Sequence, residues 1–267
     1  MRLVTAALLL LQATDGGGGG GRGGIARRSA RVELRAGLDT LYAGDFGTAA
    51  RYFADLAARD TADPAPLTFE AGAYIWWAAA KDSDDFAAAR IDSLLDRAIT
   101  LGRAREAGEE RDFWLATALG YRARERELHG HNWGAAKDAK AMRDAYRRVL
   151  AADSSCIDCF LGLGLYSYGL ARASTLAKIV GRIIGLGGGD AAEGLAMMRR
   201  VARGGDLARV EGSWVLAAAL VREAQRDDRA GPGLRAEAAA LVGGLGERYP
   251  ANPVFQRFLH EMAQAPP

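Results

Sequence analysis

The chain has 267 residues, and its 49% hydrophobic content excludes a disordered protein without a core. Its 35 Lys and Arg nearly balance its 33 Asp and Glu, so a formal charge of +2 creates no broad positive field and no nucleic-acid partner is expected. Stretches of Ala, Leu, Arg and Glu between Gly-rich breaks, with only 7 Pro, follow helix propensity. We therefore predict an all-α protein.

The first residues differ from the rest of the chain. Arg2 precedes an apolar run over residues 3–11, which is too short to cross a bilayer because a spanning helix needs about 20 residues. This order predicts a signal peptide over residues 1–14 and an exported protein of the periplasm or cell envelope. An ordinary first helix in a cytoplasmic protein is the alternative. The Gly tract predicts a flexible linker over 15–30, followed by a helical domain over 31–267.

From residue 31 onward one pattern recurs, in which two amphipathic helices are joined by a short polar or Gly turn. In the first hairpin the turn is at Gly44 and Asp45, and Pro64 is expected to close the unit. Further turns are predicted at 82–84, 131–133 and 231–233, and a closing helix over 252–264. One face of the second helix carries Phe46, Ala49, Ala50, Phe53 and Leu56. Because one hairpin cannot bury its apolar face alone, we predict stacked antiparallel hairpins that form an α-solenoid.

Several of these residues resemble those of a known family. The residues are Gly44, Asp45 and Phe46 at a turn, the pairs Leu119 with Gly120 and Leu163 with Gly164, the second-helix residues Ala49, Ala136 and Ala238, and the closing pairs Tyr249 with Pro250 and Asn252 with Pro253. They look like degenerate tetratricopeptide repeats over residues 31–264. The resemblance implies a helical-repeat fold whose usual task is to bind other proteins. The segment after residue 169 departs from the repeat.

That departing segment carries an apolar stripe at Leu176, Ile179, Val180, Ile183 and Ile184. We interpret it as a core helix that seals an end of the solenoid. A helix over 174–186 that lies on a membrane surface or docks a partner is the alternative. The Gly run at 185–189 ends this helix, and it does not indicate a nucleotide site because no strand precedes it.

The two cysteines, Cys156 and Cys159, are three residues apart. Ser155 is the expected N-cap of a helix, and Asp158 also suits a capping role, so both thiols would lie at a helix N-terminus. In an exported chain the pair predicts one short-range disulfide. A thiol oxidoreductase site is the alternative, but that chemistry expects a βαβ setting, which the helical pattern does not provide.

No catalytic residue, cofactor or metal site is predicted. His129 and His131 flank a turn and His260 lies on the last helix, which leaves too few ligands for tetrahedral zinc. We expect a non-catalytic protein-interaction module of the periplasm or cell envelope, with a protein partner and no cofactor. A thiol-disulfide protein and a membrane-apposed lipid-binding protein are the alternatives. The candidate partner-binding side chains, which at helical spacing also suit a core, are Tyr74, Trp77, Trp114, Tyr121, Tyr166 and Tyr168.

Overall fold

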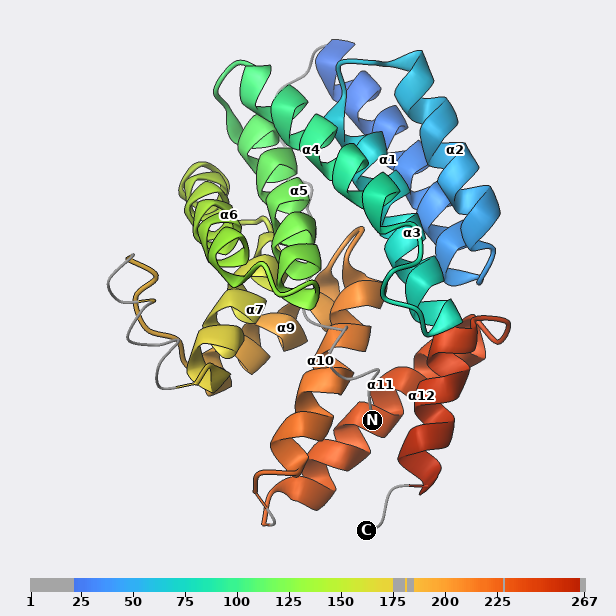
Figure 1. Cartoon of the computed structure of the whole chain (residues 1–267), viewed down its shortest axis with the longest axis vertical. Helices are drawn as coiled ribbons and strands as arrows, with labels where there is room; N and C mark the ends of the chain where they lie inside the picture. Colours follow the sequence, from blue (N-terminus) through green and yellow to red (C-terminus); the bar gives the residue numbers. More distant parts are fainter. Residues whose placement is uncertain (1–21, 175–180, 182–184, 228, 265–267) are drawn as a thin grey trace.

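The structure is a computed structural model, and it describes residues 22–174, 181, 185–227 and 229–264 (Figure 1). These residues form eleven α-helices and no β-strand, which confirms the all-α prediction. The helices are α1 (Arg22–Tyr42), α2 (Phe46–Arg59), α3 (Pro64–Lys81), α4 (Ala88–Ala104), α5 (Glu109–Leu128), α6 (Asn132–Ala152), α7 (Cys159–Arg172), α9 (Ala191–Gly204), α10 (Arg209–Ala224), α11 (Gly231–Arg248) and α12 (Pro253–Gln264).

Local side-chain caps set several helix starts. The carboxylate of Asp45 accepts from the Thr48 amide at 3.2 Å and begins α2, as the predicted turn requires. Asp190 caps α9 in the same way, accepting from the Glu193 amide at 2.8 Å. The sequence therefore indicates both helix starts, because each capping Asp directly precedes the helix that it caps.

Three predicted boundaries differ from the structure. Pro64 does not close a hairpin but is the first residue of α3, where its missing N–H leaves no helical hydrogen bond unmade. The turn predicted at 231–233 already belongs to α11, again with Pro in the first turn. Helix α1 begins at Arg22, ahead of the predicted domain start at 31. The predicted signal peptide over 1–14 lies outside the described residues.

Each helix packs against the next one along the chain, and α3 also contacts α1 and α5 (Figure 1). The face predicted for α2 is its buried face. Helices α3, α5 and α10 are buried along almost their whole length, which explains why they lack one clear polar face. Their burial places these three helices at the centre of the described part of the molecule.

The C-terminal helices return to the N-terminal ones, and α12 packs on α3 (Figure 1). Trp76 of α3 lies at this junction, with its ring centroids 5.5 Å from Tyr42, 5.5 Å from Phe255 and 6.0 Å from Trp214. The amide of Asn252 donates to the Tyr42 carbonyl at 2.9 Å. Aromatic packing and one buried hydrogen bond thus hold the first hairpin against the last helices.

A buried carboxyl group joins the central helices. Glu211 of α10 is 4% exposed, and it accepts hydrogen bonds from Trp76 Nε1 at 3.2 Å and from the Tyr121 hydroxyl at 3.4 Å. Burial raises the pKa of Glu211 to about 8, although these two donors and the charge of Arg124 lower it. Near neutral pH this side chain therefore carries a proton in the folded protein.

Helices α7 and α9 cross with their backbones in contact. A Cβ atom on Gly194 would lie 2.6 Å from the Gly164 carbonyl oxygen, and one on Gly164 would lie 2.8 Å from the Gly194 carbonyl oxygen. Since backbone atoms cannot move aside as side chains do, the crossing requires glycine at both positions.

We expect Gly194→Ala to lower the free energy of unfolding by about 2 kcal/mol or more, because the new methyl group meets backbone atoms. Gly244→Ala in α11 is the matched control, since nothing lies within 4 Å of its added Cβ, and it should stabilise the helix by about 0.5–1 kcal/mol. Urea unfolding of the three proteins measures both effects. Equal stability of the two variants would contradict the close crossing.

We expect the free energy of unfolding to fall as pH rises from 4.5 to about 8, because folded Glu211 keeps a proton that the unfolded chain releases. Glu211→Gln should reduce this fall by about 2–4 kcal/mol, since its amide does not ionise. The exposed Glu247→Gln is the control and should leave the profile unchanged. Urea unfolding at several pH values tests this, and identical pH profiles for wild type and Glu211→Gln would refute it.

Candidate functional site

Three of the predicted partner-binding rings lie in the core. Trp114, Tyr121 and Tyr168 are 5%, 1% and 1% exposed. Trp114 packs edge-on against Phe69 at 5.7 Å, and the Tyr168 hydroxyl donates to Glu223 at 2.9 Å. These rings stabilise contacts between helices and offer no face to a partner in this structure. The helical spacing of these three rings, from which we predicted a binding surface, instead reflects helix faces that are buried in the core.

Two other predicted residues, Tyr74 and Trp77, come together on the surface of α3. Both are half-buried, and their rings stack with 6.2 Å between centroids and 11° between planes. The Phe86 ring lies 5.1 Å from Trp77, and Lys81 Nζ lies 5.1 Å from the Phe86 centroid. We call Tyr74, Trp77, Lys81 and Phe86 the aromatic surface cluster. It exposes ring area next to solvent, as binding surfaces commonly do.

The end of α3 positions this cluster. Helix α2 begins beside it, and a Cβ on Gly47 would lie 3.3 Å from the Trp77 ring. After α3 the chain turns at Asp82, which has a φ of 53°, and the exposed residues 82–85 include three Asp. The Asp85 side chain is 97% exposed. The half-buried rings therefore lie beside an exposed, negatively charged turn.

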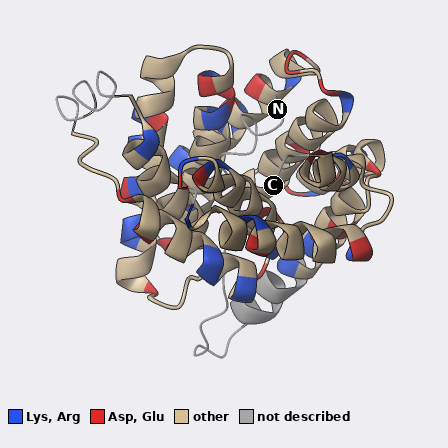
Figure 2. Cartoon of the chain, turned by 90° about the horizontal axis from the view of Figure 1, so that it is seen from below, with Lys and Arg blue, Asp and Glu red and all other residues tan. Residues whose placement is uncertain are grey.

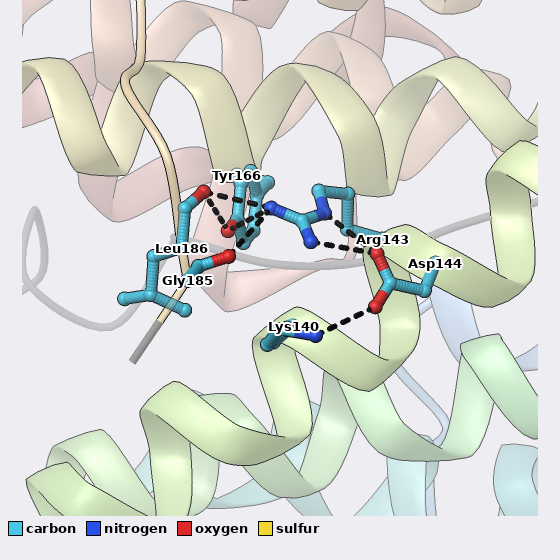
Figure 3. Close-up of polar contacts among 6 residues, drawn as sticks. All are labelled: Lys140, Arg143, Asp144, Tyr166, Gly185 and Leu186. Atoms are coloured by element: carbon cyan, nitrogen blue, oxygen red, sulfur yellow. Dashed lines mark hydrogen bonds and ion pairs between the residues drawn. The ribbon is translucent and has the colours of Figure 1, made fainter. Parts of the chain in front are cut away.

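Tyr166, the remaining predicted ring, belongs to a polar contact between α6 and the chain before α9 (Figure 3). Arg143 donates to the Tyr166 hydroxyl at 2.8 Å and to the Leu186 carbonyl at 2.7 Å, while its other nitrogen atoms bond Asp144. Tyr166 also donates to the Leu186 carbonyl at 2.6 Å. These bonds hold Leu186 against α6 and α7, so Arg143 and Tyr166 have a structural role.

The apolar stripe predicted to seal the core or to contact a membrane, residues 176, 179, 180, 183 and 184, lies outside the described residues. Of this segment the structure describes Gly181, Gly185 and Leu186, and the Leu186 side chain is buried. In the helices that are described, none has the length and apolar content to cross a membrane.

Cys156 and Cys159 are joined in a disulfide with 5.5 Å between their Cα atoms. Ser155 is not the helix N-cap that the sequence suggested, because α7 begins at Cys159 and Cys156 lies in the preceding turn. Ser155 instead donates to Asp153. Both cysteines are buried, at 2% and 0% exposure, which restricts the access of a partner thiolate to their sulfur atoms.

Asp158, between the two cysteines, makes a contact that sequence reasoning missed. Its fully buried carboxyl group accepts from the backbone amides of Asp206 at 2.8 Å and Leu207 at 3.2 Å. Burial raises the pKa of Asp158 to about 8, while these two amides and Arg31 lower it. The sequence indicated only a local capping role, and the distant amides that Asp158 binds carry no sequence signal.

The Asp158 contact extends to α1. The side chain of Asp206, whose amide bonds Asp158, accepts from Arg35 Nε at 2.8 Å and pairs with Arg31 at 3.5 Å. The disulfide turn, the loop before α10 and the first helix are thus linked in series. This chain of contacts connects residues far apart in sequence.

Many of the remaining charged groups form ion pairs between neighbouring helices, such as Arg122 and Arg126 with Asp138. In the described part of the chain no three His, Cys, Asp or Glu side chains gather where they could hold a metal ion. His129 lies 4.0 Å from Asp85, and His260 contacts Gln264 on its own helix. Figure 2 shows Lys and Arg interspersed with Asp and Glu along the helices. Charge of one sign does not dominate the face that this view presents.

Asp158→Ala should lower the free energy of unfolding by about 2–4 kcal/mol, because it leaves the buried amide of Leu207 and the part-buried amide of Asp206 without this acceptor. Asp153→Ala, which removes an acceptor from an exposed turn, is the control and should cost less than about 1 kcal/mol. Urea unfolding measures both. A smaller loss for Asp158→Ala than for Asp153→Ala would contradict the structural role of Asp158.

No protein-family model matches the chain, and no curated protein or solved structure matches it. The contacts of the aromatic surface cluster and of the disulfide turn are therefore the observations from which a function can be argued.

Proposed function

We propose that the protein is a non-catalytic interaction module, built as a tetratricopeptide-like solenoid of helix hairpins, that binds a protein partner. The sequential packing of its helices and the contacts of α3 with both α1 and α5 support this architecture. The aromatic surface cluster supports the binding role, because half-buried rings on a rigid helix lose little side-chain entropy when a partner covers them.

The chemistry around the cluster specifies the kind of partner segment. An apolar side chain would cover the stacked Tyr74 and Trp77 rings, and basic side chains would face the exposed acidic turn at 82–85. Opposite charges at the rim of an interface accelerate association and select against acidic competitors. We therefore propose a partner segment that combines an apolar anchor with Lys or Arg.

The disulfide supports a location outside the cytoplasm. Structural disulfides persist in oxidising compartments, and Cys156 and Cys159 are bonded and buried. An exported module of the periplasm or cell envelope fits this chemistry. The same burial counts against the thiol-disulfide alternative, since exchange requires a thiolate to reach a sulfur atom.

The test compares partner capture by wild type and by Trp77→Ala in the full chain. We expect Trp77→Ala to capture at least about tenfold less of the specific partner than wild type does when each is cross-linked in an envelope fraction. Removal of a central aromatic anchor commonly costs about 2 kcal/mol or more of binding energy. Trp133→Ala is the matched control, because Trp133 is an exposed Trp on a different helix, α6. It should leave capture unchanged.

The acidic turn gives an independent test. Asp84→Asn combined with Asp85→Asn should slow association with the same partner and weaken its dependence on salt, because two rim charges are removed. Circular dichroism and thermal melting establish that each variant folds. Unaltered capture by folded Trp77→Ala and by the double Asn variant would refute the proposed surface.

A further inference from the structure

A hollow of about 170 Å³ lies where α1, the start of α10 and the connection between α11 and α12 meet. It is separate from the aromatic surface cluster, since none of the four cluster residues lines it. Three segments from the beginning, middle and end of the chain contribute its walls, so it exists only in the folded protein. Its size suits a group no larger than a side chain, because pockets for drug-sized ligands have about 300–1,000 Å³.

Part of the hollow's lining is apolar and aromatic. The Tyr42 and Tyr249 rings lie 5.9 Å apart, and Leu38 and Val210 line the hollow beside them. Tyr249 donates its hydroxyl hydrogen to Asp39 at 3.1 Å. The Tyr42 hydroxyl makes no hydrogen bond to any described residue, although Tyr42 is only 2% exposed. Tyr42 lines the hollow, so a ligand there could accept a hydrogen bond from its hydroxyl.

The polar part of the lining carries more positive than negative side chains. Arg35, Arg209 and Arg248 line the hollow together with the carboxylates of Asp39 and Asp206. Arg35 is bound to Asp206, and Arg248 lies 3.7 Å from Asp39. Arg35 and Arg248 are thus each paired with a carboxylate. The side chains that line the hollow therefore carry one more positive than negative charge.

Arg209 supplies that excess. Its Nε donates to the Gly205 carbonyl at 3.2 Å, and it forms no ion pair with any described residue. A guanidinium group has five N–H donors, and its two parallel donors match the two oxygen atoms of a carboxylate. Arg209 therefore retains unused donors next to the hollow.

We propose that this hollow binds a small organic carboxylate with a flat apolar body, of the size of benzoate. The carboxylate would pair with Arg209 and with Arg248, and the apolar ring would lie against Tyr42, Tyr249 and Val210. The tyrosine rings and Val210 in the lining, together with the spare donors of Arg209, favour this class over inorganic phosphate, which has no apolar part to lie against them.

The test titrates the full chain with benzoate and follows backbone amide shifts by NMR. We expect shifts at Leu207, Val210 and Tyr249 that saturate with benzoate. Benzamide has the same shape without the charge, and it should bind about tenfold more weakly or worse. Inorganic phosphate should likewise bind more weakly than benzoate.

Variants locate the site. Arg209→Gln and Arg248→Gln should each weaken benzoate binding by about tenfold. Arg226→Gln, an exposed Arg after the other end of α10, is the matched control and should bind as wild type does. Tyr42→Phe tests the free hydroxyl and should weaken binding by a few fold without changing the charge.

Three results would each overturn the proposal. The first is the absence of saturable shifts at the hollow with benzoate. The second is equal affinity of wild type for benzamide and benzoate, which needs no variant and so does not depend on variant folding. The third is equal benzoate affinity of Arg209→Gln and Arg226→Gln, with both variants folded by thermal melting.

Discussion

The return of α12 onto α3 is the constraint on which the rest of the structure depends. Trp76 contacts rings from α1, α10 and α12, and Asn252 bonds the backbone at the end of α1. Burial of large aromatic side chains is the strongest favourable contribution that such a junction can make. Because the junction joins the two ends of the described chain, it also fixes the positions of the tyrosines that line the hollow.

Two buried carboxyl groups favour this arrangement of the helices over others, although each loses its hydration on burial. Glu211 and Asp158 are both buried, and for each the pKa is raised to about 8 by the loss of hydration. Their hydrogen-bond donors come from different helices or from a distant loop. A hydrogen-bonded polar group in a core disfavours other arrangements of the same helices, since a shift of the helices would leave it without donors.

Features that depend on neighbouring residues were predictable, whereas those that depend on tertiary contact were not. The caps at Asp45 and Asp190 follow from their local sequences. Asp158 also directly precedes a helix, α7, yet its carboxyl group binds the amides of residues 206 and 207. Trp76 and Trp77 are adjacent, but one is in the central junction and the other is at the surface. Only the packing of α3 against its neighbours distinguishes them.

Repeat proteins usually tolerate the gain or loss of whole units, because each unit contacts only the next one. In this protein the last helices also contact the first ones, through the hydrogen bond from Asn252 to Tyr42 and the packing of α12 on α3. A helix pair inserted or deleted between α3 and α11 would therefore have to preserve that contact. The two joined ends constrain the number of helices between them more tightly than they constrain the loops and the surface.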